Sequence, residues 1–170
     1  MTLRDEYLNR IHSEFIPPLR TFIDLNFSSI HQDREDTLQD ILEKLVARIY
    51  SYDNRYALST WVYAVARNHC LDLLRKQKRQ PSFSGLDEGN VLVSSETSPE
   101  DILAENQDQT RMRQLMARLP REERQVLFLK YYEDMTFKEI ARVMSRPVGT
   151  VKYLSFKAKS WIEAQWEDNQ

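Results

Sequence analysis

Residues 136–159, TFKEIARVMSRPVGTVKYLSFKAK, predict two short helices joined by a tight turn. Thr136 and Glu139 have the spacing of a capping box, which marks the start of the first helix. Pro147 suits the first position of the second helix, because the N–H group that proline lacks has no helical partner there. The second helix turns Val151 inward and leaves a mostly basic and aromatic set facing outward. That set is Lys152, Tyr153, Phe156, Lys157 and Lys159.

The charge of this stretch is one-sided. Between Arg142 and Ser160 there are five basic residues and no acidic residue. A helix face that is merely solvated usually mixes the two signs. The pattern therefore favours a helix-turn-helix, which places its second helix in a DNA major groove, over a plain helical hairpin.

The composition favours an all-α fold for the whole chain. Only three glycines occur among 170 residues, whereas a β-rich fold of this length needs more glycines in its turns. Neither a P-loop nor a dinucleotide-binding fingerprint is present. The single cysteine, Cys70, excludes internal disulfide bonds and cysteine zinc sites, and the three histidines lack metal-ligand spacing. We expect no metal site and no cofactor.

Charge and hydropathy limit the choice of partner and compartment. The formal net charge is −2, whereas a non-specific DNA-binding protein is normally basic. Any contact with DNA must therefore depend on charge that is segregated along the chain. No apolar run approaches the roughly 20 residues that span a bilayer, and the polar N-terminus MTLRDEYLNR is not a signal peptide. We expect a cytoplasmic protein without direct membrane insertion.

Three segments of the chain differ in pattern. Residues 1–80 form a helical block that ends in a basic cluster. Residues 81–98 hold two of the three glycines and no Lys or Arg, as expected for a flexible acidic linker. Residues 99–170 form a second helical block, in which Pro99 starts a helix and the helix-turn-helix follows. The prediction is two small helical domains joined by this linker.

Three boundaries are predicted inside the first block. Pro17 and Pro18 interrupt the backbone hydrogen bonding, so that a helix ends before them and another restarts. The polar and aromatic residues 51–58 form a loop. Ser59 or Thr60 then caps a long helix, whose end is basic.

Three stretches, in this order along the chain, resemble the extracytoplasmic-function (ECF) sigma factors, the small members of the bacterial sigma-70 family. They are DREDTLQDILEKL (33–45), STWVYAVARNHCLDLLRKQKR (59–79) and LPREERQVLFLKYYEDMTFKEIARVMSRPVGTVK (119–152). The resemblance covers nearly the whole chain and includes a linker where the family has one. Two independent motif blocks in register are more specific than either block alone.

The resemblance implies a subunit of bacterial RNA polymerase that supplies promoter specificity and is not itself an enzyme. Its partners would be the RNA polymerase core and promoter DNA. The N-terminal domain would read and open the minus-ten element, and the C-terminal domain would read the minus-thirty-five element. The acidic linker would lie along the path of template DNA or nascent RNA. Family members are often held inactive by an anti-sigma factor, which is frequently bound to the membrane.

An acidic stripe on the helix at 33–50 matches the family segment that binds the coiled coil of the largest polymerase subunit. Carboxylates on a rigid helix can pair with arginines of a partner helix. The alternative is a solvated face that complements the helix dipole. The stripe consists of Asp36, Gln39, Asp40 and Glu43.

The minus-ten surface implied by the resemblance combines a loop with one face of the helix at 59–79. Asn and Arg can hydrogen-bond base edges, and Arg and Lys can hold phosphates. Aromatic rings can stack on unpaired bases, which contributes roughly 1–3 kcal/mol per base. Trp61 is equally consistent with a place in the core. The candidates are Tyr52, Asn54, Tyr56, Trp61, Tyr63, Asn68, Asp72, Arg75 and Lys76.

The recognition helix is expected to bind the minus-thirty-five element. Groove contacts are assigned to Lys152, Tyr153, Phe156 and Lys157, and phosphate contacts to Arg146 and Thr150. Three positions depart from the family pattern and affect the expected base specificity. Ser145 replaces the usual turn glycine, Leu154 replaces an arginine, and Ser155 replaces an apolar residue.

Two other functions are consistent with the residues taken alone. The first is a stand-alone helix-turn-helix transcription regulator, which would bind a specific duplex tightly without polymerase. The second is an all-α interaction module whose charged faces contact only proteins. The sequence offers no combination of nucleophile, base and orienting group, so nothing in it supports an enzymatic function.

Overall fold

The computed structural model describes residues 1–80 and 106–168, and within them all regular structure is helical. The predicted all-α class is thereby confirmed. The N-terminal region contains α1 (Leu3–Arg10), the π-helical η1 (Ile11–Phe15), α2 (Ile16–Asn26), α3 (Arg34–Arg48), the 3-10 helix η2 (Ile49–Ser51) and α4 (Leu58–Lys78). The C-terminal region contains α6 (Gln107–Arg118), α7 (Arg121–Leu127), the π-helical η3 (Phe128–Tyr132), α8 (Phe137–Met144) and α9 (Val148–Asp168). The predicted linker and the predicted helix start at Pro99 lie outside the described residues.

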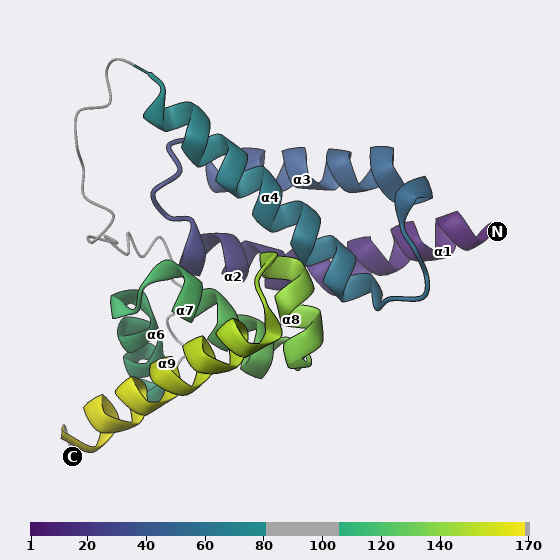
Figure 1. Ribbon diagram of the computed structural model, residues 1–170. Helices are drawn as coiled ribbons and strands as arrows, with labels where there is room; N and C mark the ends of the chain where they lie inside the picture. Colours follow the sequence, from purple (N-terminus) through teal and green to yellow (C-terminus); the bar gives the residue numbers. More distant parts are fainter. Residues whose placement is uncertain (81–105, 169–170) are drawn as a thin grey trace.

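The first three elements follow one another without a break (Figure 1). The prediction that Pro17 and Pro18 separate two helices is therefore wrong in detail. Both prolines lie in the first turn of α2, where backbone N–H groups have no helical partner in any case. The preceding residues form the wider π-helix, which carries the chain into α2. The chain therefore changes from π-helix to α-helix at Ile16 without a break in the helical backbone.

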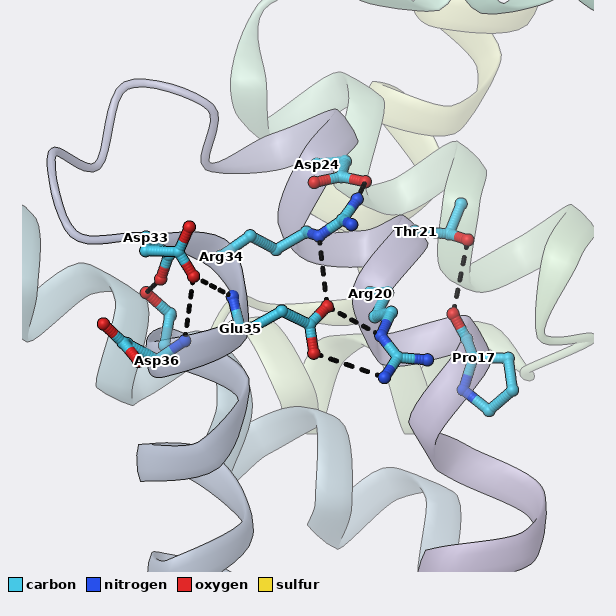
Figure 2. A network of polar contacts seen from close by, with 9 residues as sticks. Pro17, Arg20, Thr21, Asp24, Asp33, Arg34, Glu35 and Asp36 are labelled. Carbon is cyan, nitrogen blue, oxygen red and sulfur yellow. Dashed lines mark hydrogen bonds and ion pairs between the residues drawn. The ribbon is translucent and has the colours of Figure 1, made fainter. Parts of the chain in front are cut away.

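A polar network fixes the start of α3 against α2 (Figure 2). Asp33 caps α3 by accepting hydrogen bonds from the backbone N–H groups of Glu35, at 2.8 Å, and Asp36, at 3.3 Å. Arg20 of α2 donates two hydrogen bonds to the Glu35 carboxylate, and Arg34 donates to Asp24 of α2. These contacts set the direction of α3, which carries the acidic stripe.

The start of α4 differs from the prediction. The helix begins at Leu58 after Ala57, and no side chain caps it. Ser59 and Thr60 already belong to the first turn, and Thr60 is buried. The predicted cap at Ser59 or Thr60 is therefore wrong, because burial of Leu58 extends the helix by one residue beyond the polar pair.

The helix-turn-helix is confirmed. Thr136 and Glu139 form the predicted capping box, with the Glu139 N–H donating to Thr136 Oγ1 at 3.2 Å and the Thr136 N–H donating to Glu139 Oε2 at 2.8 Å. The helix α8 ends at Ser145, whose φ of 51° and ψ of 45° are left-handed. Pro147 lies just before α9 rather than at its first position, and its carbonyl accepts from the Val151 N–H.

One cluster of buried residues runs across both regions. The helix α2 packs on α7, and α4 packs on α8, as Figure 1 shows. At the centre, the ring of Phe128 lies 5.4 Å from that of Phe22 and 6.1 Å from that of Tyr63, measured between centroids. A smaller cluster joins α6, α7 and α9 through Leu115, Leu119, Leu127, Ala158 and Ile162.

Candidate nucleic-acid interface

The outer face of α9 carries the residues that were assigned to the minus-thirty-five element. Lys152, Tyr153, Phe156 and Lys157 are all exposed, and Phe156 exposes 74% of its surface. Exposed aromatic rings between lysines can contact thymine methyl groups while the lysines approach phosphates. The structure therefore brings the predicted groove residues together on one exposed side of α9.

Two acidic residues of α7 form ion pairs with basic side chains of this surface. Lys157 Nζ lies 3.2 Å from an oxygen of the buried Glu123, and Arg146 donates to Glu122 at 2.6 Å. Thr150, the other predicted phosphate contact, is exposed. Sequence reasoning missed Glu122 and Glu123, since acids in the first turn of a helix are expected for the helix dipole alone.

The three departures from the family pattern have different locations. Ser145 is an exposed turn residue. Ser155 is buried, and Leu154 is half-buried against the common core. The replacement at Ser155 therefore changes packing beneath the recognition helix rather than a group that faces DNA.

A hollow of about 700 Å³ lies beside the loop before α4. Residues from α1, this loop and the C-terminal region line it, among them Tyr7, Tyr52, Asn54, Tyr56 and Glu133. The centre of the Tyr52 ring lies 5.0 Å from that of Tyr7, in an edge-on contact, and 5.5 Å from that of Trp61, to which it is tilted by 41°. The Tyr52 hydroxyl donates to the Tyr56 carbonyl at 2.6 Å. The loop is thus held in one shape, with aromatic rings around a space large enough for a base.

The predicted aromatic residues are not equally available. Tyr56 is 40% exposed, Trp61 is half-buried, and Tyr63 is fully buried. Burial and the nearby Glu133 carboxylate raise the pKa of Tyr63, so that its hydroxyl stays neutral. Tyr63 cannot stack on a base in this arrangement, because it packs against Phe22 and Phe128. The sequence pattern of the α4 segment did not show that Tyr63 is buried while Tyr56 is exposed.

The remaining minus-ten candidates lie on the outer side of α4. Asn68, Arg75 and Lys76 are exposed, and Asp72 is half-buried. Arg75 Nη1 donates to Asp72 Oδ1 at 2.8 Å. An exposed pair at i and i+3 contributes only a few tenths of a kcal/mol, so Arg75 can exchange this partner for a phosphate or a base.

The acidic stripe lies along α3. Asp36, Gln39 and Glu43 are exposed, whereas Asp40 is half-buried and accepts from Gln32 Nε2 at 3.1 Å. Gln39 donates to Glu43 at 3.4 Å. The stripe therefore presents carboxylates on one side of a helix whose start is fixed by the network of Figure 2.

Chemistry of other kinds has little support in the described parts of the chain. No group of three or more His, Cys, Asp and Glu residues with the geometry of a metal site occurs in residues 1–80 and 106–168. Cys70 is buried, and burial raises the pKa of its thiol to about 12. No helix in the same residues is long and apolar enough to cross a membrane.

Comparisons with known proteins agree with this geometry. A family model described as sigma-70 region 2 matches residues 23–80, and one described as sigma-70 region 4 matches residues 109–162. The ECF RNA polymerase sigma factor RpoE of Cereibacter sphaeroides is 29% identical over 143 residues, which cover 84% of this chain and 76% of the relative. SigW of Bacillus subtilis, also an ECF sigma factor, is 28% identical over 149 residues, covering 82% and 78%.

Two solved structures have a similar fold. The sigma factor RpoE of Bartonella quintana, in complex with the anti-sigma factor NepR, superimposes with a TM-score of 0.73 at 19% identity, covering 99% of this chain and 100% of that one. CnrH, in complex with the cytosolic domain of CnrY, gives a TM-score of 0.64 at 15% identity, covering 98% and 90%. Because two sigma-70 family models match residues 23–80 and 109–162 and the relatives found are ECF sigma factors, the chain belongs to the sigma-70 family and to its extracytoplasmic-function group.

Proposed function

We propose that this chain is an ECF sigma factor that directs core RNA polymerase to specific promoters and assists their opening. One observation carries the proposal. A single chain holds the region 2 match with an aromatic hollow and a basic helix end, followed by the region 4 match with an exposed basic recognition helix. A stand-alone regulator needs only the second of these features.

In the N-terminal region, residues 1–80, we assign the minus-ten element to the loop and the outer face of α4. Tyr56 and Asn54 bind an unpaired base in the hollow, and Tyr52 and Trp61 support the loop from behind. Asn68, Arg75 and Lys76 contact the strand beside it. Stacking of roughly 1–3 kcal/mol per base partly offsets the few kcal/mol needed to unstack the duplex.

In the C-terminal region, residues 99–170, we assign the minus-thirty-five element to α9 and the turn before it. Lys152, Tyr153, Phe156 and Lys157 enter the major groove. Arg146 and Thr150 bind phosphates. In the free protein Glu122 orients Arg146 and Glu123 orients Lys157, and DNA phosphates then take the place of these carboxylates. A phosphate accepts charge-assisted hydrogen bonds from Arg and Lys, and its neutralisation releases counterions, which favours the exchange.

The acidic stripe of α3 is assigned to the polymerase core. Asp36, Gln39 and Glu43 are exposed on one side of a fixed helix, which suits pairing with basic residues of a partner helix. The core enzyme performs the chemistry, so we assign no catalytic residue to this chain. A protein that acts on polymerase and DNA works in the cytoplasm.

An anti-sigma factor is a further expected partner. The two solved proteins that resemble this fold were both captured in complexes: the sigma factor RpoE with the anti-sigma factor NepR, and CnrH with the cytosolic domain of CnrY. We propose that a protein of this kind restrains the present chain as well. Its identity and the signal that releases it depend on a protein outside this chain.

Run-off transcription tests the proposal. Core RNA polymerase plus this protein is expected to produce discrete transcripts from a genomic fragment library, and core enzyme alone is not. Asp36→Lys together with Glu43→Lys should abolish both the transcripts and the binding to core enzyme. Tight binding of a specific duplex by the chain alone, without any effect of polymerase, would instead establish a stand-alone regulator.

A further inference from the structure

We propose that His69 of α4 is a positioning residue of the surface that binds the polymerase core, and that the hollow beside it receives an arginine side chain of the core enzyme. The inference rests on the proposed function, since it concerns the acidic stripe of α3. It adds to that stripe a side chain from the helix assigned to the minus-ten element, and it makes Asp40 the main contact with the arginine.

A second hollow, of about 320 Å³, lies where α3 packs on α4 (Figure 1). Four residues of α3 and one of α4 line this α3–α4 hollow, namely Asp40, Glu43, Lys44, Ala47 and His69. Two carboxylates and a single ammonium group give it a net negative charge while the histidine is neutral. The hollow therefore favours a cation, and both of its carboxylates belong to the stripe that we assign to the polymerase core.

His69 is a buried polar side chain that lacks a partner in the free chain. It exposes 7% of its surface, and neither ring nitrogen has a hydrogen-bond partner within the part of the chain that the structure describes. Buried polar groups in proteins are nearly always hydrogen-bonded, because an unpaired one lowers stability. Burial, assisted by the charge of Lys44, lowers the pKa of His69. The ring is therefore neutral at neutral pH, where one nitrogen is a donor and the other an acceptor.

Asp40 connects His69 to the acidic stripe. His69 Nε2 lies 3.7 Å from Asp40 Oδ2, and Gln32 Nε2 donates to the same oxygen at 3.1 Å. Asp40 Oδ1 accepts no hydrogen bond from residues 1–80 and 106–168. A shift of the carboxylate by about half an ångström brings the ring N–H of His69 within hydrogen-bond distance. His69 and Gln32 then hold one oxygen of Asp40 and leave the other for the partner.

An arginine fits the α3–α4 hollow better than a lysine does. Its guanidinium group has five N–H donors in one plane and can donate to two carboxylates at once, whereas a lysine donates from a single atom. Asp40 and Glu43 are three residues apart on α3, so their side chains are neighbours on the same face. Glu43 accepts only a long hydrogen bond from Gln39, at 3.4 Å, and is free to take a charged donor instead. One arginine can therefore bridge Asp40 and Glu43.

Binding of the full-length chain to core RNA polymerase tests the role of His69. The chain carries a fluorescein label and is titrated with core enzyme, and the stability of each variant is measured by urea denaturation. His69→Leu is expected to bind core enzyme roughly five- to tenfold more weakly, because Asp40 loses a donor that orients it. The same variant is expected to be more stable than the wild type, because the unpaired ring is removed. A purely structural role for His69 predicts no such opposition between binding and stability.

Further variants decide whether His69 acts through Asp40. His69→Gln keeps a side chain that can donate to Asp40, so it should restore part of the binding that His69→Leu loses. Asp40→Asn should weaken binding by itself, and adding His69→Leu to it should cost little more. His12→Leu removes an exposed histidine from another element and should bind as the wild type does. The positioning role is overturned if His69→Leu binds core enzyme normally, or if its loss is equally large in the Asp40→Asn background.

A measurement without polymerase separates this inference from the proposed function. The probe is arginine amide, added to the full-length chain with isotope-labelled histidine, and the ring signals are followed by nuclear magnetic resonance. We expect a saturable shift of the His69 signals that Asp40→Asn abolishes. Normal core binding by both the wild type and His69→Leu would reject the inference and keep the sigma function. Without any core binding by the wild type the sigma function fails, and the His69 shift alone then decides whether the hollow binds a guanidinium group.

Discussion

The helices α4 and α9 are both 21 residues long and both carry a predicted DNA-binding face, but they are buried to different extents. The helix α4 is buried along most of its length and packs against α3 and α8. The helix α9 buries only one stripe, formed by Val151, Ser155, Ala158 and Ile162. The comparison shows that the groove residues we assign to the minus-thirty-five element are all exposed, whereas two aromatic candidates for the minus-ten element, Trp61 and Tyr63, are half-buried and buried.

The largest expected effect comes from breaking the covered side of α4. Phe128→Ala removes a ring that is 2% exposed and contacts Phe22 and Tyr63 of the other region. We expect the free energy of unfolding to fall by about 3–5 kcal/mol, as for other buried phenylalanines. Urea denaturation followed by circular dichroism measures the change.

The matched control is Tyr131→Ala, an aromatic residue of the same segment that is 60% exposed. Its effect should stay within about 0.5 kcal/mol. If Phe128→Ala also cost less than about 1 kcal/mol, the aromatic contact between the regions would not be formed in solution. The contrast between α4 and α9 would then fail.

Features of α8 and α9 that depend only on residues close together in the sequence could be predicted. The capping box of Thr136 and Glu139 and the outward set on α9 follow from spacing along the chain, and both are confirmed. Pro147 was placed within one residue. These features are local, so three or four residues contain the information that determines them.

The features that join distant segments were not predictable. Tyr63 and Trp61 both looked like aromatic residues near a loop, and only the packing of Phe128 shows that Tyr63 is unavailable. Arg67 and Arg142 contact residues from the other region, and single-sequence patterns do not record such contacts. The choice between an exposed and a covered DNA-binding face depends on tertiary packing, which composition cannot supply.

The buried side of α4 also contains a histidine, His69, whose burial makes stability depend on pH. It is 7% exposed, and neither ring nitrogen has a hydrogen-bond partner within the described residues. Burial, assisted by Lys44, lowers its pKa. The unfolded chain therefore binds more protons than the folded chain as the pH falls below about 6.5, and stability is lost with falling pH in that range.

We expect His69→Leu to remove this dependence, because leucine keeps apolar contacts and has no group to protonate. The free energy of unfolding should rise by about 1 kcal/mol at neutral pH and by more near pH 5. Urea denaturation at several pH values between about 5 and 7 measures the difference. Parallel pH profiles for the two proteins would mean that Asp40, whose Oδ2 lies 3.7 Å from His69 Nε2, offsets the effect of burial. His12→Leu, at an exposed position, controls for the loss of a histidine.

Lys157→Ala tests the open side of the comparison. The lysine is exposed on α9 and pairs with Glu123 in the free protein. We expect promoter binding by the holoenzyme to weaken and the slope of log K against log salt to fall by about 1, because a lysine in the groove also approaches a phosphate and that contact is lost. Lys159→Ala, whose partner Glu163 lies on the same helix, is the control and should leave the slope unchanged. An unchanged slope for Lys157→Ala would remove it from the phosphate contacts.

Ser145→Gly has the smallest expected effect and tests the turn that aims α9. Ser145 has a left-handed backbone, with φ at 51° and ψ at 45°, which costs a residue with a side chain roughly 1–2 kcal/mol. Glycine relieves most of this strain but gives the unfolded chain more freedom. We therefore expect a net gain of about 0.5 kcal/mol by thermal or urea denaturation, and none for Ser145→Ala. Because the backbone of the turn is unchanged in either variant, α9 keeps its direction and promoter affinity should not change. A shift in affinity for Ser145→Gly alone would mean that the serine hydroxyl, or the stiffness it confers on the turn, takes part in positioning the recognition helix.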